Sequence, residues 1–273
     1  MGETMIDRAA PHDSLMTTLS ALVKYRTLLR KLVLKDLKLK YRGSALGFLW
    51  SLVNPVVMIA VYSLAFRYIL HNRTEGFVFL VLIGILAWTF FSNAAMMSTG
   101  AIADSGSLLK SVFFPRAILP IGTVLFNLTQ YLLMAVVLIP VMLIAFRLPP
   151  AAPMLAYPVF VALQVIFTIG VALILATATT FFRDVRHLLE VALAVLFWTT
   201  PILYELSQVP ERFRLALLAS PVASYVVAYK DILFYRRWPE PAVWTFAVAY
   251  AIIAFAIGAA LLLAFEDRFA EQT

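Results

Sequence analysis

Four cations near the amino terminus have the spacing most open to a chemical interpretation. Lys31, Lys35, Lys38 and Arg42 are separated by four, three and four positions, so they share one face of a helix whose other face is apolar. A helix of this kind lies along a membrane surface with its cations toward anionic lipid headgroups or a cytosolic partner. The spacing therefore predicts an amphipathic interface helix over residues 20–42.

Side chains that could perform catalysis or bind a metal are few and stand apart from one another. The chain has no Cys, which excludes disulfides and thiolate ligands, and its three His residues have no partner at metal-ligand spacing. Asp104, Asp184, Glu205 and Asp231 form neither an Asp-x-Asp pair nor a His–Asp cluster. No metal site is expected, and a membrane-embedded glycosyltransferase or acyltransferase, which needs grouped acids and bases, is disfavoured.

Binding of nucleotide or nucleic acid is not expected either. A phosphate-binding loop needs Gly-Lys followed by Ser or Thr, and none of the ten Gly residues is followed by Lys. The net charge is +7, but nine of the 22 Lys and Arg residues lie within the first 42 positions, directly before a long apolar run. Such clustering indicates the cytoplasmic flank of a membrane span rather than a surface for nucleic acid.

Long uncharged runs dominate the rest of the chain. Five runs of 24 to 35 residues contain no Asp, Glu, Lys or Arg, and 63% of all residues are hydrophobic. About 20 such residues suffice to cross the hydrocarbon of a membrane. We therefore expect an all-α, polytopic integral membrane protein. Because the runs lack intramembrane charges, an ion-driven secondary transporter is disfavoured, and the energy for any transport must come from another subunit.

Six spans within one domain, residues 1–273, account for the pattern of charges. The first apolar run starts too late for a cleaved signal peptide, so both termini are expected in the cytoplasm of a bacterial inner membrane. The fifth span has only 14 uncharged residues, and it is included because it returns the carboxyl terminus to the cytoplasm after the charged loop at Arg183. The expected spans are 43–70, 77–98, 117–146, 154–182, 191–204 and 242–265, the first five lying within residues 43–205.

Residues 206–240 fit neither a span nor an ordinary loop. Pro residues divide them, and two short apolar stretches, 213–219 and 222–234, lie between. We expect two short re-entrant helices at the outer side of the membrane. They would line or cap a passage, because irregular backbone at membrane depth must be covered by protein or face water. An amphipathic flap on the surface is the alternative.

Uncharged side chains within the spans could bind sugars. Five aromatic residues could stack on the apolar faces of sugar rings: Phe48, Tyr62 and Phe66 in the first span, and Trp198 and Tyr204 in the fifth. The alternative is the aromatic belt at the headgroups, which is how we interpret Trp50. Five amides could bind sugar hydroxyls, although hydrogen bonds between helices are their more common role. They are Asn54, Asn93, Asn127, Gln130 and Gln164.

Three stretches of sequence carry a resemblance to a known family. The first is residues 34–55 (LKDLKLKYRGSALGFLWSLVNP) and the second is residues 108–120 (LLKSVFFPRAILP). The third is residues 182–187 (FRDVRH), which TPILY follows at residues 200–204. Together and in this order they resemble the permease subunit of ABC transporters of the type-2, polysaccharide-exporting family, over about residues 25–265.

The resemblance implies a function and a set of partners. ATP and Mg²⁺ would be bound by a separate nucleotide-binding ATPase subunit and not by this chain. Six helices from one chain are too few to enclose a wide channel, so we expect a homodimer with two ATPase subunits. The cargo would be a lipid-linked polysaccharide, foremost an O-antigen of lipopolysaccharide, with capsular polysaccharide or teichoic acid as alternatives.

The resemblance also implies roles for particular residues. The inner loop between the second and third spans would touch the ATPase, with its last three residues forming a compact knob in an ATPase cleft. The residues assigned to coupling are Asp104, Leu108, Lys110, Phe114, Pro115, Arg116, Arg183 and Asp184. The short helices before the last span would form a gate. Its residues are Ser220 and Pro221, where the family often has Asn-Pro, together with Tyr225 and Tyr229.

Overall fold

The computed structural model describes residues 24–44, 50–65, 76–105, 114–147, 149–205 and 209–265. Within these ranges every regular element is a helix. The α-helices are α2 (Arg26–Tyr41), α3 (Trp50–Leu64), α4 (Phe77–Thr99), α6 (Ile118–Ala145), α7 (Tyr157–Phe181), α8 (Val185–Thr199), α9 (Glu211–Leu218), α10 (Ala223–Tyr229) and α11 (Pro241–Phe265). Three short elements join them: η3 (Ala103–Ser105), η4 (Ala152–Ala156) and the π-helical η6 (Lys230–Tyr235).

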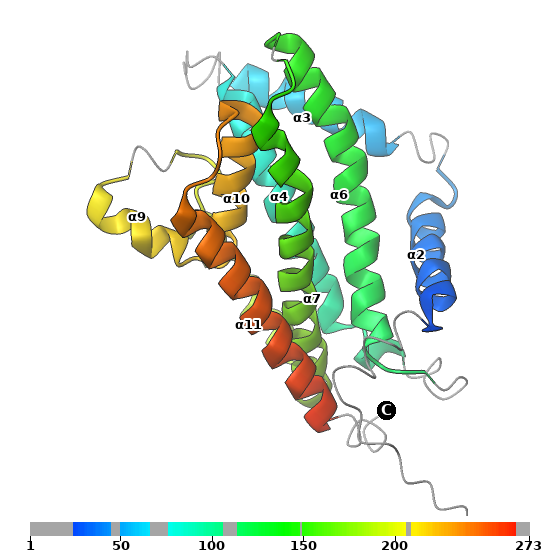
Figure 1. Cartoon of the computed structure of the whole chain (residues 1–273). Helices are drawn as coiled ribbons and strands as arrows, with labels where there is room; N and C mark the ends of the chain where they lie inside the picture. The colour runs from blue at the N-terminus through cyan, green and yellow to red at the C-terminus, as the bar shows by residue number, and fades with distance from the viewer. Residues whose placement is uncertain are drawn as a thin grey trace, which may run out of the picture.

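Four long helices form the body of the molecule (Figure 1). They are α4, α6, α7 with the short η4 before it, and α11, and each is long and apolar enough to cross a membrane. α4 packs against α6 and α7, and α7 packs against α11. These helices correspond to the expected second, third, fourth and sixth spans, which confirms the helical membrane architecture at this level.

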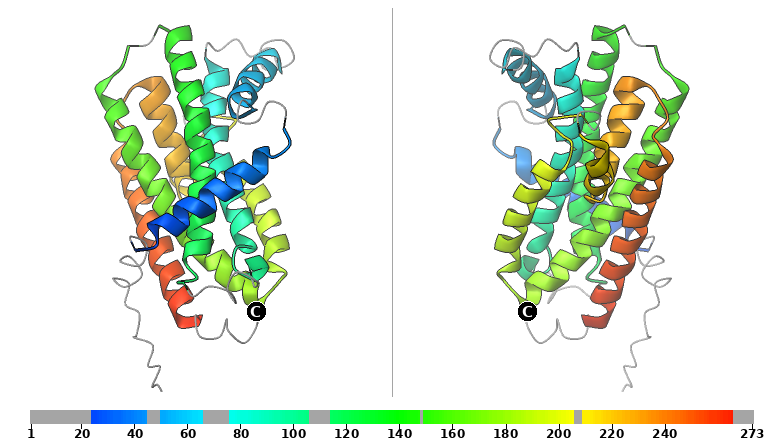
Figure 2. Two further views of the ribbon diagram at one scale, coloured as in Figure 1. Left: turned by 90° about the vertical axis from the view of Figure 1, so that its right-hand side faces the viewer. Right: turned by 90° about the vertical axis from the view of Figure 1, so that its left-hand side faces the viewer.

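The helices at the expected first and fifth spans are shorter. α3 and α8 have 15 residues each, so each is about 22 Å long, less than the roughly 30 Å of a hydrocarbon core. α3 lies across one end of the bundle rather than along it (Figures 1 and 2). α8 begins at Val185, six residues earlier than expected, and ends before Pro201. The count of six spans therefore stays a prediction.

α9 and α10 differ sharply in burial. The two are bent by 107° at the break between them. Phe213 and Leu215 of α9 are exposed, whereas all seven residues of α10 are buried. α10 packs against α4, α7 and α11. The alternative of a surface flap therefore does not hold for α10. This helix belongs to the main hydrophobic cluster, formed with α4, α6, α7 and α11, which we call the central core.

The backbones of α7 and α11 approach each other closely at two glycines. A Cβ atom on Gly170 would lie 2.3 Å from the carbonyl carbon of Ala254, and one on Gly258 would lie 2.3 Å from the carbonyl oxygen of Gly170. Small residues let two membrane helices meet at this distance, where van der Waals packing holds them together. This contact fixes α11 to the rest of the bundle.

A separate helix, α2, lies where the interface helix is predicted, and its placement at a membrane surface stays a prediction. α2 crosses the outside of α6 (Figure 2). Its Leu29 is buried, and its Leu32 lies 3.6 Å from where a Cβ on Gly122 of α6 would be. The four cations of the predicted stripe are exposed on its other side. Apolar burial against α6 therefore orients the cationic face outward.

Candidate functional site

A cavity of about 220 Å³ lies where α2, α3, α4 and α6 meet. We call it the amide pocket, because three amide side chains are among the residues that line it. Asn93 comes from α4, and Asn127 and Gln130 come from α6. The Asn127 Nδ2 donates to the carbonyl of Thr123 at 2.9 Å. The same Nδ2 also lies 3.4 Å from Met97 Sδ, and no described residue donates to the Oδ1, so the pocket offers a hydrogen-bond acceptor as well as donors.

One cation closes the polar end of the amide pocket. Lys40, at the end of α2, donates from its Nζ to the Oε1 of Gln130. Partial burial lowers the pKa of Lys40 below its usual value. An anionic group entering here would gain a charge-assisted hydrogen bond from this ammonium.

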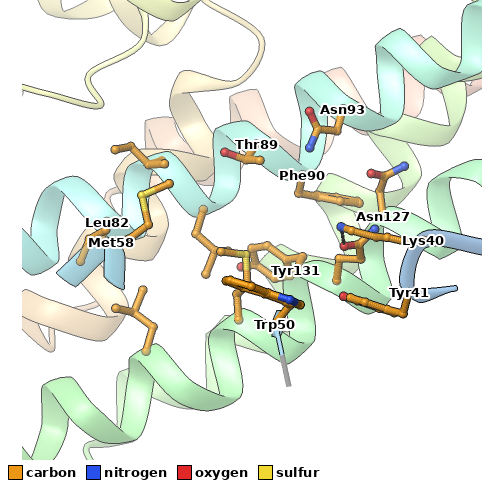
Figure 3. A pocket seen from close by; sticks show the side chains of 15 residues that line it. Lys40, Tyr41, Trp50, Met58, Leu82, Thr89, Phe90, Asn93, Asn127 and Tyr131 are labelled. Atoms are coloured by element: carbon orange, nitrogen blue, oxygen red, sulfur yellow. Dashed lines mark hydrogen bonds between the residues drawn. The ribbon is translucent and has the colours of Figure 1, made fainter. Parts of the chain in front are cut away.

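Aromatic rings form the middle of the amide pocket. Trp50 of α3 faces Phe90 and Tyr131 across it (Figure 3). The rings of Phe90 and Tyr131 pack with centroids 5.5 Å apart, and the Tyr131 hydroxyl lies 2.8 Å from that of Tyr157. The ring packing and the hydrogen bond together hold Tyr131 in place. Mostly apolar walls with a few placed polar groups are typical of ligand-binding cavities.

The amide pocket is polar at one end and apolar at the other. Figure 3 shows Lys40, Asn93 and Asn127 together at one end and Leu82 and Met58 at the other. The polar end is nearer the last turn of α4, since Asn93 follows Leu82 along that helix. The cavity therefore has the polarity of an amphiphile, with a headgroup end and a chain end.

The aromatic residues predicted to contact sugar lie elsewhere. Phe48 and Phe66 are outside the described residues. Tyr62 packs, partly buried, against the central core. On and after α8, Trp198 is 69% exposed, and the Tyr204 hydroxyl donates to its carbonyl at 3.2 Å. None of these three lines the amide pocket. Of the five amides proposed as sugar ligands from the sequence, three line the amide pocket. Trp50, which also lines it, had been assigned to the aromatic belt at the headgroups.

Two of the predicted coupling elements meet at the end of the bundle where α4 ends. An Arg186 Nη2 lies 3.5 Å from Asp104 Oδ2, and Arg186 Nε donates to Thr99 Oγ1 at 3.2 Å. Gly100 makes room, because a Cβ there would lie 2.1 Å from the Asp104 carboxylate. The loop after α4 and the start of α8 are thus joined. Arg183 and Asp184 lie exposed just before Arg186.

The knob predicted at the end of the inner loop needs a correction. Leu108 and Lys110 lie outside the described residues. Phe114 is only 6% exposed and packs in a second hydrophobic cluster with Leu29 of α2 and Ile118 of α6. It is not an exposed knob in this arrangement, because its ring is buried in an apolar cluster whose members come from α2, α6, α7 and α11. Its role in coupling stays a prediction. Pro115 and Arg116 are partly exposed beside it.

The predicted gate residues are part of the central packing. Tyr225 donates to the carbonyl of Ala247 on α11 at 2.8 Å. Tyr229 donates to Gln164 Oε1 on α7 at 2.7 Å, and Gln164 Nε2 donates to the carbonyl of Ala87 on α4 at 2.9 Å. α10 is thereby tied to three helices. Gln164 has the interhelical role that the sequence analysis named as the more common one.

The other two gate residues form the turn into α10. Ser220 is buried with its Oγ 3.3 Å from Thr200 Oγ1. Pro221 is partly buried and follows it directly. In this arrangement the four residues belong to α10 and the turn before it, which pack against the bundle, and none of them lines the amide pocket.

α8 carries an apolar face that the described part of the chain does not cover. Leu188, Val191, Val195 and Trp198 follow one another at steps of three, four and three, and each is 59% to 69% exposed. We call these four residues the α8 stripe. Contiguous exposed apolar surface of this kind marks a contact with lipid or with another protein.

Comparison with known proteins agrees with the architecture. Residues 27–234 match the family described as ABC-2 type transporter. The chain is 32% identical over 256 residues to the O-antigen export system permease protein RfbA of Myxococcus xanthus, covering 92% of this chain and 97% of that protein. It is 28% identical over 198 residues to the protein of the same name from Klebsiella pneumoniae, covering 72% and 76%. It is 23% identical over 242 residues to the polysialic acid transport protein KpsM of Escherichia coli, covering 86% and 92%. The match to the family covers most of the chain and the first of these relatives aligns over nearly its whole length, so this chain belongs to the ABC-2 type transporter family.

Proposed function

We propose that this chain is the membrane-spanning permease subunit of an ATP-driven exporter that moves lipid-linked O-antigen across the bacterial inner membrane. The observation that carries the proposal is the 32% identity to an O-antigen export permease over 97% of that relative's length. The lower identity to KpsM, 23% over 92% of its length, makes capsular polysaccharide the second candidate cargo.

ATP hydrolysis is assigned to a separate subunit with its own Mg²⁺. The Asp104–Arg186 pair is the proposed docking end for that subunit, because it joins the loop after α4 to the start of α8. A partner that displaces one of these two elements would move the other. The exposed cations of α2 are assigned to anionic lipid headgroups at the cytoplasmic surface.

The amide pocket supports an amphiphilic cargo. Its polar end, with Lys40, suits the phosphate and first sugar of a lipid-linked chain, and its apolar end suits the start of the lipid. The aromatic rings between them offer flat apolar faces for a sugar ring. On this proposal the pocket holds the junction between sugar and lipid while the rest of the chain is moved.

A homodimer would complete the pathway. The central core of one chain is filled with side chains, including all of α10. Two chains that meet through their α8 stripes would cover that apolar face and place a second bundle beside the first. Both termini are assigned to the cytoplasm, and residues 206–240 to the outer side.

Loss of the chain tests the cargo directly. A strain that lacks it should make lipopolysaccharide without the O-antigen ladder on a gel and should accumulate the lipid-linked polymer at the inner face of the membrane. Capsule staining of the same strain is the control. A normal ladder with capsule lost would refute O-antigen and favour the second candidate.

Topology and the partner are tested with single-Cys variants and an affinity tag. The chain has no Cys, and Arg212 on α9 is exposed, so Arg212→Cys can be labelled selectively. Labelling from the periplasmic side is expected, and labelling only from the cytoplasm would overturn the topology. The tagged chain should co-purify with a nucleotide-binding subunit and should show no ATPase activity when freed from it.

A further inference from the structure

Lys230 is a buried cation that belongs neither to the amide pocket nor to the Asp104–Arg186 contact. It begins the π-helical turn η6 directly after α10 and is only 5% exposed. Its Nζ donates to three backbone carbonyls, of Pro201 at 2.6 Å, Ile202 at 3.0 Å and Tyr204 at 3.1 Å. An ammonium group has three donors, so all of them are used.

The three carbonyls belong to a segment that needs such a donor. Residues 200–204 follow α8 with neither helix nor strand. Ile202 is fully buried, and its Cα would lie 3.2 Å from a Cβ on Gly84 of α4. Irregular backbone inside a membrane bundle is stable only where its polar groups find partners within the protein. Lys230 supplies partners for three of these carbonyls at once.

A second polar contact joins the same two parts of the chain. The Thr200 Oγ1 at the start of the segment lies 3.3 Å from Ser220 Oγ at the turn before α10. The segment after α8 is therefore held at both ends of α10, by Ser220 before it and by Lys230 after it. We call this arrangement the carbonyl clasp: Lys230, residues 200–204 and Ser220.

Asp231, the neighbour in sequence, does not neutralise the charge of Lys230, and Glu205 is the carboxylate that acts on it electrostatically. Asp231 is buried, and its Oδ1 accepts from Arg237 Nη2 at 2.7 Å and from Nε at 2.8 Å. That carboxylate already has a cation. Carbonyl dipoles are thus the direct hydrogen-bond partners of the Lys230 ammonium, and it follows them if they move.

We propose that Lys230 is a positioning residue that makes the hairpin of α9 and α10 move together with the outer end of α8. The first turn of α8 carries Arg186, which is paired with Asp104. The last turn of α8 is followed directly by residues 200–204 of the carbonyl clasp. If the Arg186 end of α8 is displaced, residues 200–204 move with the helix, and the three hydrogen bonds of Lys230 pull α10 along. The clasp itself follows from contacts on the described residues; only the claim that it transmits export motion rests on the proposed function.

The test compares two substitutions whose ranking distinguishes a clasp from a space-filling side chain. Lys230→Met keeps the length of the side chain and removes every donor, whereas Lys230→Arg keeps the charge and the donors but is larger. If Lys230 holds the carbonyls, Arg should be tolerated better than Met. If it only fills space, Met should be tolerated better than Arg, because overpacking of a core is destabilising.

Spin-label distances measure the clasp in the complete chain with its co-purified nucleotide-binding subunit in lipid nanodiscs. One label pair reports on α8 and α9 through Ala194→Cys and Leu215→Cys, both at exposed positions. A control pair reports on α6 and α11 through Val136→Cys and Ile252→Cys, also exposed. Dilution with unlabelled chain restricts each signal to one protomer.

The expected result is the loss of a single narrow 194–215 distance in Lys230→Met, with the 136–252 distance unchanged and Lys230→Arg close to wild type. Lys24→Met, a change at an exposed Lys outside these contacts, should leave both distances unchanged. A narrow 194–215 distance in Lys230→Met, or a poorer result for Arg than for Met, would overturn the proposal. If Lys230→Met fails to fold, the yields of folded Arg and Met variants give the same ranking.

Transmission is tested in cells that carry the same variants. Lys230→Met should hydrolyse ATP with its partner subunit but lose surface polysaccharide, while Lys230→Arg should keep both. Normal export by a Lys230→Met chain with a broadened 194–215 distance would refute transmission. If the wild-type chain exports no O-antigen, the proposed function fails, and the distance measurement still decides whether the clasp exists.

Discussion

The contact between α7 and α11 gives the sharpest prediction, through Gly258→Ala. The new Cβ would lie 2.3 Å from the carbonyl oxygen of Gly170, and ordinary contact begins at 3.4 Å, so the helices would have to separate by about 1.1 Å. The obstructing atoms are backbone, and no side-chain rotation can relieve them. α11 has 25 residues, and a separation at one point loosens the packing on either side.

The cost can be estimated from the general penalty for overpacking. Forcing extra atoms into a packed core costs about 1–3 kcal/mol, and a clash with the Gly170 backbone, which cannot rotate away, places Gly258→Ala at the upper end of that range. About 3 kcal/mol corresponds to roughly a 100-fold change in the unfolding equilibrium, since each 1.4 kcal/mol is tenfold. The variant should insert into the membrane and then unfold far more readily than wild type.

Thermal unfolding of the purified chain in detergent measures the effect, and Gly122→Ala is the matched control. A Cβ on Gly122, also within a long helix, would lie 3.6 Å from a Leu32 side chain, which is an ordinary contact. Because Ala favours a helix over Gly by about 0.5–1 kcal/mol, this control should be neutral or stabilising. Equal unfolding temperatures for the two variants would refute the account of the α7–α11 contact.

Three other changes follow from the contacts described. Phe114→Ala should destabilise the chain by about 3–5 kcal/mol, the usual cost of removing a buried ring, measured by thermal unfolding; a neutral effect would return this residue to an exposed role. Gln164→Leu leaves the Tyr229 hydroxyl without its acceptor and should cost about 1–3 kcal/mol, whereas the double variant with Tyr229→Phe should recover much of that loss. Arg186→Ala removes a pair whose side chains are 47% and 74% exposed, so unfolding should change by less than about 1 kcal/mol, while export should fall if the contact with Asp104 transmits motion. Export at the wild-type level would remove the coupling role from this pair.

The sequence was enough to predict the elements whose signal is local. α4, α6, α7 and α11 each fill a long uncharged run, and hydrophobic length alone identifies such helices. The cationic face of α2 was predicted from a spacing within one helix, and its four cations are exposed in the structure. In both cases the information lies in neighbouring positions along the chain.

Features that depend on distant partners were missed or misassigned. Lys230 received no assignment and Asp231 was only an isolated acid, because their partners lie at residues 201–204 and at Arg237. Phe114 was assigned to a contact with another subunit, whereas its ring is buried in a cluster with apolar residues of α2, α6, α7 and α11. The amide pocket combines side chains from four helices, and the rotation of each helix about its own axis is set only when the bundle packs.

The complete burial of α10 has a consequence for how the molecule is made. A helix of seven residues, about 10 Å long, is too short to enter the bilayer as a span of its own. Its surroundings are provided by α4, α7 and α11, and α11 is the last of these to leave the ribosome. The central core therefore cannot close during synthesis of the first 240 residues. The hairpin must wait, with its apolar face uncovered, until the final helix has been inserted, and a chain that stops before α11 would present α10 to the quality-control proteases of the membrane.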